Sequence, residues 1–107
     1  MDSEDFYFSA ESENGRTIPD PSEDAIYMLL EGLDLSDNTF LTLEPTDASE
    51  GWYVSIAKQS EDEYEVEFRD ALTREHEITV KGDKGRIAKE ATLWVAGRPA
   101  VARRRAL

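Results

Sequence analysis

The chain has 107 residues, of which 39% are hydrophobic and 34% charged, with no cysteine and a formal net charge of −12. This length predicts one domain with a single core, and the absence of cysteine excludes disulfides and thiolate chemistry. The acidic N-terminus lacks the basic and apolar regions of a signal peptide, and no apolar run approaches the ~18 residues that a membrane span needs. We therefore expect a cytoplasmic protein that neither enters nor crosses a membrane.

The acidic residues are concentrated in the first half of the chain. Residues 1–57 contain fourteen acidic residues and one basic residue, a formal charge of −13, whereas residues 58–107 contain ten acidic and eleven basic residues, or +1. This surplus of negative charge argues against direct binding of nucleic acid, because binding to a phosphate backbone requires a basic surface. It favours a cationic protein partner, although an acidic surface can also serve solubility alone.

The pattern of apolar residues predicts five strands and two helices. Alternation with period 2 indicates the strands, and apolar residues at i, i+3, i+4 and i+7 indicate the helices. Asp20 is the expected N-cap of the first helix and Gly32 its end; Asp83 and Gly97 have the same roles in the second helix. In chain order, the predicted elements are strand 5–11, helix 20–32, strands 38–45, 52–59, 64–69 and 74–81, and helix 83–97.

A run of consecutive strands flanked by helices is typical of the α+β class. We expect an antiparallel sheet of about five strands, with both helices packed on one face, in the order β-α-β-β-β-β-α. Residues 1–98 form the predicted domain, and residues 99–107, which include Arg103, Arg104 and Arg105, form a predicted flexible basic tail. Trp52 and Trp94 fall at positions expected in the core, whereas Tyr53 falls on the opposite strand face and is expected to be exposed.

The segment "EDEYEVEFRDALTREHEITV", residues 61–80, predicts a hairpin with an acidic face. If all apolar residues share one face, Phe68 lies opposite His76, Val66 opposite Ile78, and Tyr64 opposite Val80. In that register His76 packs on Phe68 as a partly buried histidine. The other face pairs Arg69 with Glu75, Glu63 with Lys81, and Glu67 with Glu77, the last being a repulsive pair. The predicted acidic face comprises Glu63, Glu65, Glu67, Glu75 and Glu77, with Tyr53 beside it. This face is either a docking surface for a cationic partner or simply the solvated side of the sheet.

The sequence lacks the motifs of the common catalytic and metal sites. One histidine and no cysteine do not supply the usual ligands of a zinc site, and the acidic clusters lack the glycine turn of a calcium loop. No G-x-S-x-G elbow, P-loop or dinucleotide-binding glycine motif occurs. We expect no enzyme activity, no cofactor and no metal; the alternative, a small hydrolase or metal enzyme, would depend on His76.

The stretches "YEVEFRDALTREHEITV" and "IAKEATLWVAGRP" resemble small actinobacterial proteins of the Imm1-like bacterial immunity group. The residues that match are Glu67, Arg69, His76 and Trp94, within an architecture that covers roughly residues 25–98. The resemblance implies an immunity protein that binds and neutralises a toxin domain, often a nuclease with a basic substrate channel.

Three kinds of partner therefore remain open. The leading hypothesis is a non-enzymatic acidic binding protein that neutralises a basic protein, such as a cognate toxin. A secretion chaperone or interaction module would instead hold a partner segment in an apolar groove or at a sheet edge. A DNA-mimic inhibitor of a nucleic-acid-binding protein shares every compositional feature of the leading hypothesis.

Overall fold

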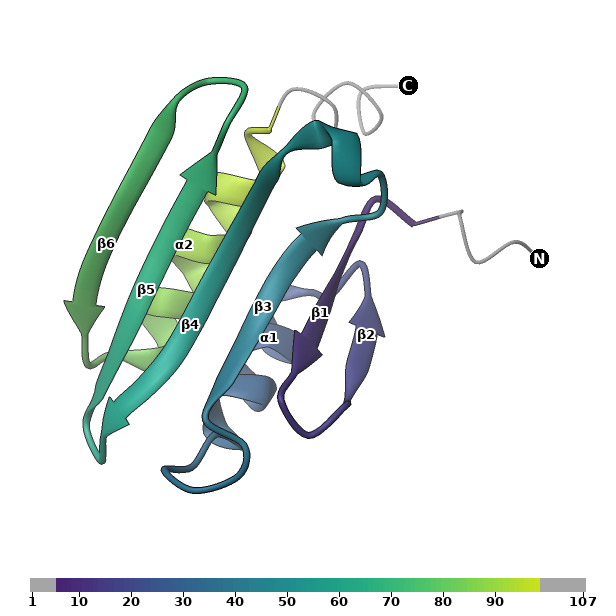
Figure 1. The fold of residues 1–107 in the computed structure, drawn as a ribbon. Helices are drawn as coiled ribbons and strands as arrows, with labels where there is room; N and C mark the ends of the chain where they lie inside the picture. Colours follow the sequence, from purple (N-terminus) through teal and green to yellow (C-terminus); the bar gives the residue numbers. More distant parts are fainter. Residues whose placement is uncertain (1–5, 99–107) are drawn as a thin grey trace.

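The computed structural model describes residues 6–98 and has the α+β architecture that the sequence predicts. One antiparallel sheet of six strands has the order β2-β1-β3-β4-β5-β6, and two helices lie against one of its faces (Figure 1). The elements are β1 (Phe8–Ser12), β2 (Thr17–Pro19), α1 (Glu23–Glu31), β3 (Phe40–Pro45), the short 3-10 helix η1 (Ala48–Glu50), β4 (Trp52–Ser60), β5 (Glu63–Asp70), β6 (Glu75–Lys81) and α2 (Lys84–Ala96).

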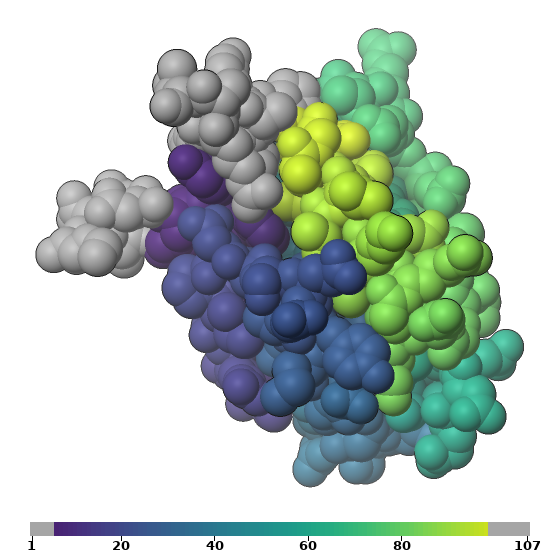
Figure 2. All heavy atoms as spheres, turned by 180° about the vertical axis from the view of Figure 1, so that it is seen from behind, coloured from purple at the N-terminus to yellow at the C-terminus, as the bar shows by residue number. Residues whose placement is uncertain are grey.

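The core lies between the helices and the face of the sheet that they cover. Side chains along each strand alternate between the two faces. Alternate residues of β1, β3, β4 and β5 are therefore buried under α1 and α2, except that Pro45 and Lys58 are only half-buried. The two helices also pack against each other, and together they cover the back of the molecule (Figure 2). The largest fully buried apolar side chains are Leu41, Leu43, Val54, Ile56 and Val66 from the sheet and Ile26, Leu30, Ile87 and Val95 from the helices.

Strand β2 was not predicted, and it accounts for the sixth strand. It has only three residues, two of them exposed, and it ends at Pro19. A segment this short shows no readable alternation. The turn at Asn14 and Gly15, where Gly15 has φ of 90°, connects β1 to β2.

The N-cap of α1 is Ser22, and the prediction of Asp20 was wrong. The Ser22 hydroxyl accepts a hydrogen bond from the Ala25 amide at 3.1 Å. Asp20 instead has φ of 42°, and its Oδ1 accepts hydrogen bonds from the backbone amides of Tyr7 and Phe8, which fasten the chain after β2 to the start of β1. The other predicted helix boundaries at Gly32, Asp83 and Gly97 are confirmed.

The predicted register of the β5–β6 hairpin was wrong by one residue. Phe68 lies opposite Glu77, and Arg69 lies opposite His76, so the expected pairs Arg69–Glu75, Glu63–Lys81 and Glu67–Glu77 do not form. His76 consequently lies on the helix-free face and not on the apolar face beside Phe68. The loop of residues 71–74 ends at Arg74, whose φ of 63° supplies the left-handed conformation that glycine often provides.

The position of β6 at the edge of the sheet explains this error. The prediction assumed that one face of β6 is buried, but every residue of β6 is exposed or only half-buried. Polar contacts with α2 therefore stabilise the observed register: Glu75 contacts Arg98, and Lys81 contacts Glu90 at 3.0 Å. Ile78 and Val80 are left on the helix-free face, with exposed fractions of 54% and 57%.

The predicted tail, residues 99–107, lies outside the described residues. Within residues 6–98, neither helix combines the length and the apolar character required to span a bilayer.

Candidate binding face

The face of the sheet that carries no helix is a continuous surface built from five strands, β1 and β3–β6. The register places Glu11, Thr42, Ser55, Glu67 and Ile78 in one row across these strands. A second row contains Phe40, Ala57, Glu65 and Val80. We call this surface the open face; it is turned toward the viewer in Figure 1, with both helices behind the sheet.

The open face carries a strong surplus of negative charge. Arg69 is the basic residue among its strand positions, opposite Tyr53 on one side and His76 on the other. Glu65 on β5 is exposed and makes no hydrogen bond or ion pair within the described part of the chain. Its acidic residues are Glu11, Glu44, Glu63, Glu65 and Glu67, each alternating with buried residues of the same strand.

Three side chains from β4, β5 and β6 form a hydrogen-bonded cluster on the β6 side of the open face. The Tyr53 hydroxyl donates to Oε2 of Glu67 at 3.0 Å, and Nε2 of His76 lies 2.7 Å from the same oxygen. The hydrogen bond with His76, followed by that with Tyr53, lowers the pKa of Glu67 from its usual 4.5 despite partial desolvation. Burial and the carboxylate of Glu67 raise the pKa of Tyr53. Glu67 is therefore held as a carboxylate between two neutral or cationic groups, and the cluster fixes its position.

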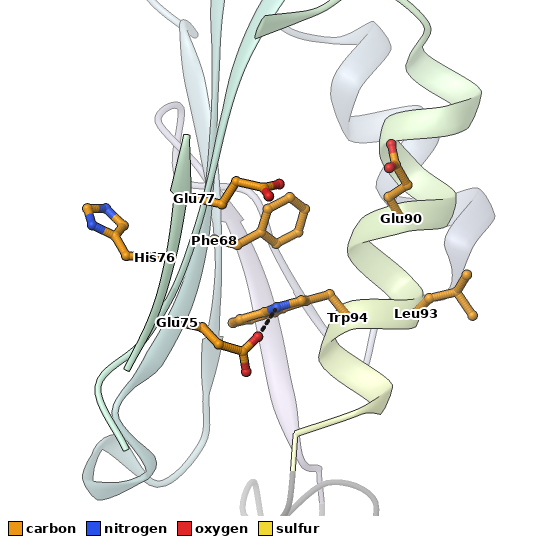
Figure 3. A pocket seen from close by; sticks show the side chains of 7 residues that line it. All are labelled: Phe68, Glu75, His76, Glu77, Glu90, Leu93 and Trp94. Carbon is orange, nitrogen blue, oxygen red and sulfur yellow. Dashed lines mark hydrogen bonds between the residues drawn. The ribbon is translucent and has the colours of Figure 1, made fainter. Parts of the chain in front are cut away.

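The structure brings together only part of the predicted acidic face. Glu63, Glu65, Glu67 and Tyr53 share the open face, as expected. Glu75 and Glu77 do not, because their side chains point to the helix side of β6. Of the residues matching the immunity group, Glu67, Arg69 and His76 lie on the open face, whereas Trp94 lies on α2 behind the sheet (Figure 3).

Glu75 and Glu77 border a groove of about 570 Å³ between β6 and α2, shown in Figure 3. The ring centroids of Phe68 and Trp94 lie 5.3 Å apart in this groove. The Trp94 indole N–H donates a hydrogen bond to Glu75 at 3.2 Å. The ring of His76 points to the opposite side of the sheet.

Arg98, two residues after the end of α2, contacts Glu75 and Trp94, which line this groove. Its Nη1 lies 2.7 Å from Oδ2 of Asp70 and 2.8 Å from Oε1 of Glu75, and its guanidinium stacks on Trp94 at 3.8 Å. This pairing lowers the pKa of Glu75 to about 2. Sequence reasoning missed Asp70 and Arg98, since no spacing or motif links the aspartate at the end of β5 to an arginine 28 residues later.

The open face can act chemically through charge and hydrogen bonds. Its carboxylates can accept hydrogen bonds from arginine and lysine side chains, and Tyr53 adds aromatic surface. Within residues 6–98, no group of three histidine, cysteine or acidic side chains is arranged to hold a metal ion. The absence of catalysis remains a prediction.

No protein-family model, no curated protein and no solved structure matches this chain.

Proposed function

We propose that this chain is a non-enzymatic cytoplasmic binding protein that neutralises a cationic protein partner through its open face. The specific role that we propose is immunity against a toxin of the nuclease type. The observation that carries the proposal is an uncovered sheet face with five glutamates and one arginine among its strand positions.

The geometry of this face supports a protein partner. A sheet surface of five strands is broad, as a protein interface requires, because stable protein interfaces bury about 800 Å² on each side. Inhibition by covering a basic channel needs only shape and charge complementarity. Such charges accelerate association and improve specificity more than they increase affinity.

The hydrogen-bonded cluster of Tyr53, Glu67 and His76 and the neighbouring Glu65 have different expected roles in binding. Glu65 has no partner among the described residues, so it can form a salt bridge without breaking an existing contact. Glu67 is already held by Tyr53 and His76, so it presents a fixed carboxylate with little conformational freedom left to lose. We propose Tyr53 as the aromatic anchor next to them.

Affinity capture from a lysate of the source cell, at low and at high salt, tests this proposal. The immobilised chain is compared with Glu65→Gln/Glu67→Gln and with the control Glu23→Gln/Glu31→Gln, which removes the same charge from α1 on the back. We expect a basic protein to be retained at low salt and released at high salt, with slower association for the open-face variant and unchanged association for the control. An equal loss of binding in both variants would show that net charge alone causes the effect and that the open face is not the binding site.

The identity of the retained protein distinguishes the related roles. A toxin should arrest the growth of a bacterial host, and co-expression of this chain should restore growth. If the retained protein binds nucleic acid and a DNA fragment displaces the chain, the DNA-mimic alternative is correct. A partner that resists high salt and survives the open-face substitutions would support the chaperone alternative.

A further inference from the structure

The two edges of the sheet differ sharply in how they are protected from pairing with another strand. Edge strands expose unpaired backbone N–H and C=O groups, and proteins usually protect them by shortness, charged side chains, proline, bulges or covering segments. Strand β2 follows this rule, since it has three residues and ends at Pro19. Strand β6 has seven residues, contains no proline, and pairs with β5 without a register shift. Beyond β6, no described part of the chain covers its outer edge (Figure 1).

Strand β6 also carries exposed apolar side chains near its middle. Ile78 and Val80 are 54% and 57% exposed, and both lie on the open face at the edge of the molecule. Exposed β-branched residues on a long edge strand favour the addition of a further strand.

We propose that the free edge of β6 is a self-complementary interface, at which two copies of this chain pair antiparallel around a two-fold axis at Ile78. A two-fold interface uses the same surface on both subunits, so a residue on the axis meets its own copy. The result would be one continuous sheet of twelve strands, with both open faces on the same side.

The sequence of β6 is complementary to itself in this register. Glu75 lies opposite Lys81 of the second copy at each end, so opposite charges meet twice. On the open face, His76 lies opposite Val80, and Ile78 lies opposite Ile78. On the helix side, Glu77 lies opposite Thr79, so no like charges face each other directly.

Other symmetric registers are less favourable. A shift that centres the axis on Glu77 places two glutamates directly opposite each other, which is destabilising. A shift that centres the axis on Thr79 leaves Glu75 with no opposite residue in the β6 strand of the second copy, and it shortens the paired segment. If one β6 strand is shifted along the other by an odd number of residues, the two open faces lie on opposite sides of the joined sheet. A two-fold axis perpendicular to the sheet forbids this arrangement. The register centred on Ile78 alone pairs all seven residues of β6 with opposite charges aligned.

Single cysteine substitutions test this register directly, because the natural chain contains no cysteine. In Ile78→Cys, the two cysteines meet at the axis with Cα atoms about 4.5–5.5 Å apart, within the range that a disulfide requires. Val80→Cys is the matched control, since its exposure is similar and it lies on the same face. In the proposed dimer its two copies are offset by four residues, about 13 Å along the strand, which is too far for a disulfide.

Under mild oxidation, we expect covalent dimer from Ile78→Cys at least ~10-fold faster than from Val80→Cys. An equimolar mixture of His76→Cys and Val80→Cys should form a mixed dimer faster than either variant alone. Equal rates for Ile78→Cys and Val80→Cys would indicate random collision and would overturn the proposal. Circular dichroism of both variants checks that the fold is retained.

Sedimentation of the unmodified chain supplies an independent measurement. Two copies carry a combined formal charge of −24, twice the −12 of one chain, so added salt should strengthen the dimer by screening repulsion. Binding of a cationic partner should respond to salt in the opposite direction, so the two proposals succeed or fail separately. A monomer at every protein and salt concentration would refute the dimer.

Discussion

At the scale of single residues, Arg98 has the most connected side chain in the described structure. It is 7% exposed, contacts Asp70 and Glu75 through one nitrogen, and stacks on Trp94. Asp70 is only 1% exposed, and its other carboxylate oxygen accepts hydrogen bonds from the Leu72 and Thr73 amides in the hairpin loop. One guanidinium thus holds the loop between β5 and β6 against the end of α2.

Arg98→Ala should lower the free energy of unfolding by about 3–5 kcal/mol, because the substitution leaves the buried carboxylate of Asp70 without its cation. Urea unfolding followed by tryptophan fluorescence measures this loss. Arg86→Ala is the control, since Arg86 is exposed on α2 and its side chain makes no hydrogen bond or ion pair with the described residues; its effect should stay within about 0.5 kcal/mol. A loss for Arg98→Ala as small as that of the control would show that Asp70 does not depend on this pairing.

The open-face cluster shows how residue identity alone can mislead. From the sequence, Glu67 and Tyr53 were expected on one face of the sheet and His76 on the other. Once His76 lies opposite Arg69, its ring reaches Glu67, and Tyr53 reaches the same carboxylate from β4. Their contact depends on strand register, which the spacing of the residues does not determine.

At the scale of elements, helices were predicted more reliably than the edge strands. The apolar face of α1 and the N-cap of α2 follow from local chemistry, because the backbone hydrogen bonds of a helix join residues only a few positions apart. The start of α1 was ambiguous because Asp20 and Ser22 are both good caps and flank Pro21. Asp20 is used elsewhere, to hold the backbone of β1.

Ser22→Ala should therefore destabilise the protein by about 1 kcal/mol, the usual cost of removing an N-cap. Asp20→Asn is the matched variant and should cost less than about 0.5 kcal/mol, since asparagine tolerates a positive φ and still offers an acceptor oxygen to Tyr7 and Phe8. Urea midpoints of both variants provide the comparison. If Asp20→Asn proves more destabilising than Ser22→Ala, the negative charge at position 20 contributes more than the cap.

At the scale of the whole molecule, two helices on one side of a six-stranded sheet leave the other side open. The core needs only the covered side, so the open face is free to carry charge without loss of packing. This separation allows one small chain to combine a closed apolar core with a strongly acidic surface.

Several structural carboxylates make the stability of the whole fold dependent on acid. Hydrogen bonds from backbone amides lower the pKa of Asp34 to about 2 and also lower the pKa of Glu13. The contact with Arg98 lowers the pKa of Glu75 to about 2, and the contact with His76 lowers the pKa of Glu67. Each carboxyl binds a proton less readily in the folded chain than in the unfolded chain. Its contribution to stability is complete above the unfolded-state pKa, which is 4.5 for glutamate and 3.8 for aspartate, and is lost as pH falls below that value. For Glu75 and Asp34 the loss extends down to about pH 2.

We therefore expect the free energy of unfolding to fall steadily from about pH 5 to pH 2. Glu75→Gln should be less stable at pH 7 and should show a shallower decline in this range. Urea unfolding at a series of pH values, for the natural chain and this variant, measures both slopes. Parallel curves would show that Glu75 does not contribute to the acid dependence.

The sequence by itself determined the α+β class, both helices with most of their boundaries, and the strands that contribute to the core. These features follow from local patterns of apolar residues, caps and turns, whose physical causes lie within a few residues along the chain. Only the tertiary structure decided the register of β6, the place of Glu75 and Glu77 behind the sheet, and the Asp70–Arg98 pair. An edge strand exposed on both faces has no apolar pattern that fixes its register, so contacts with a helix that follows later in the chain decided it.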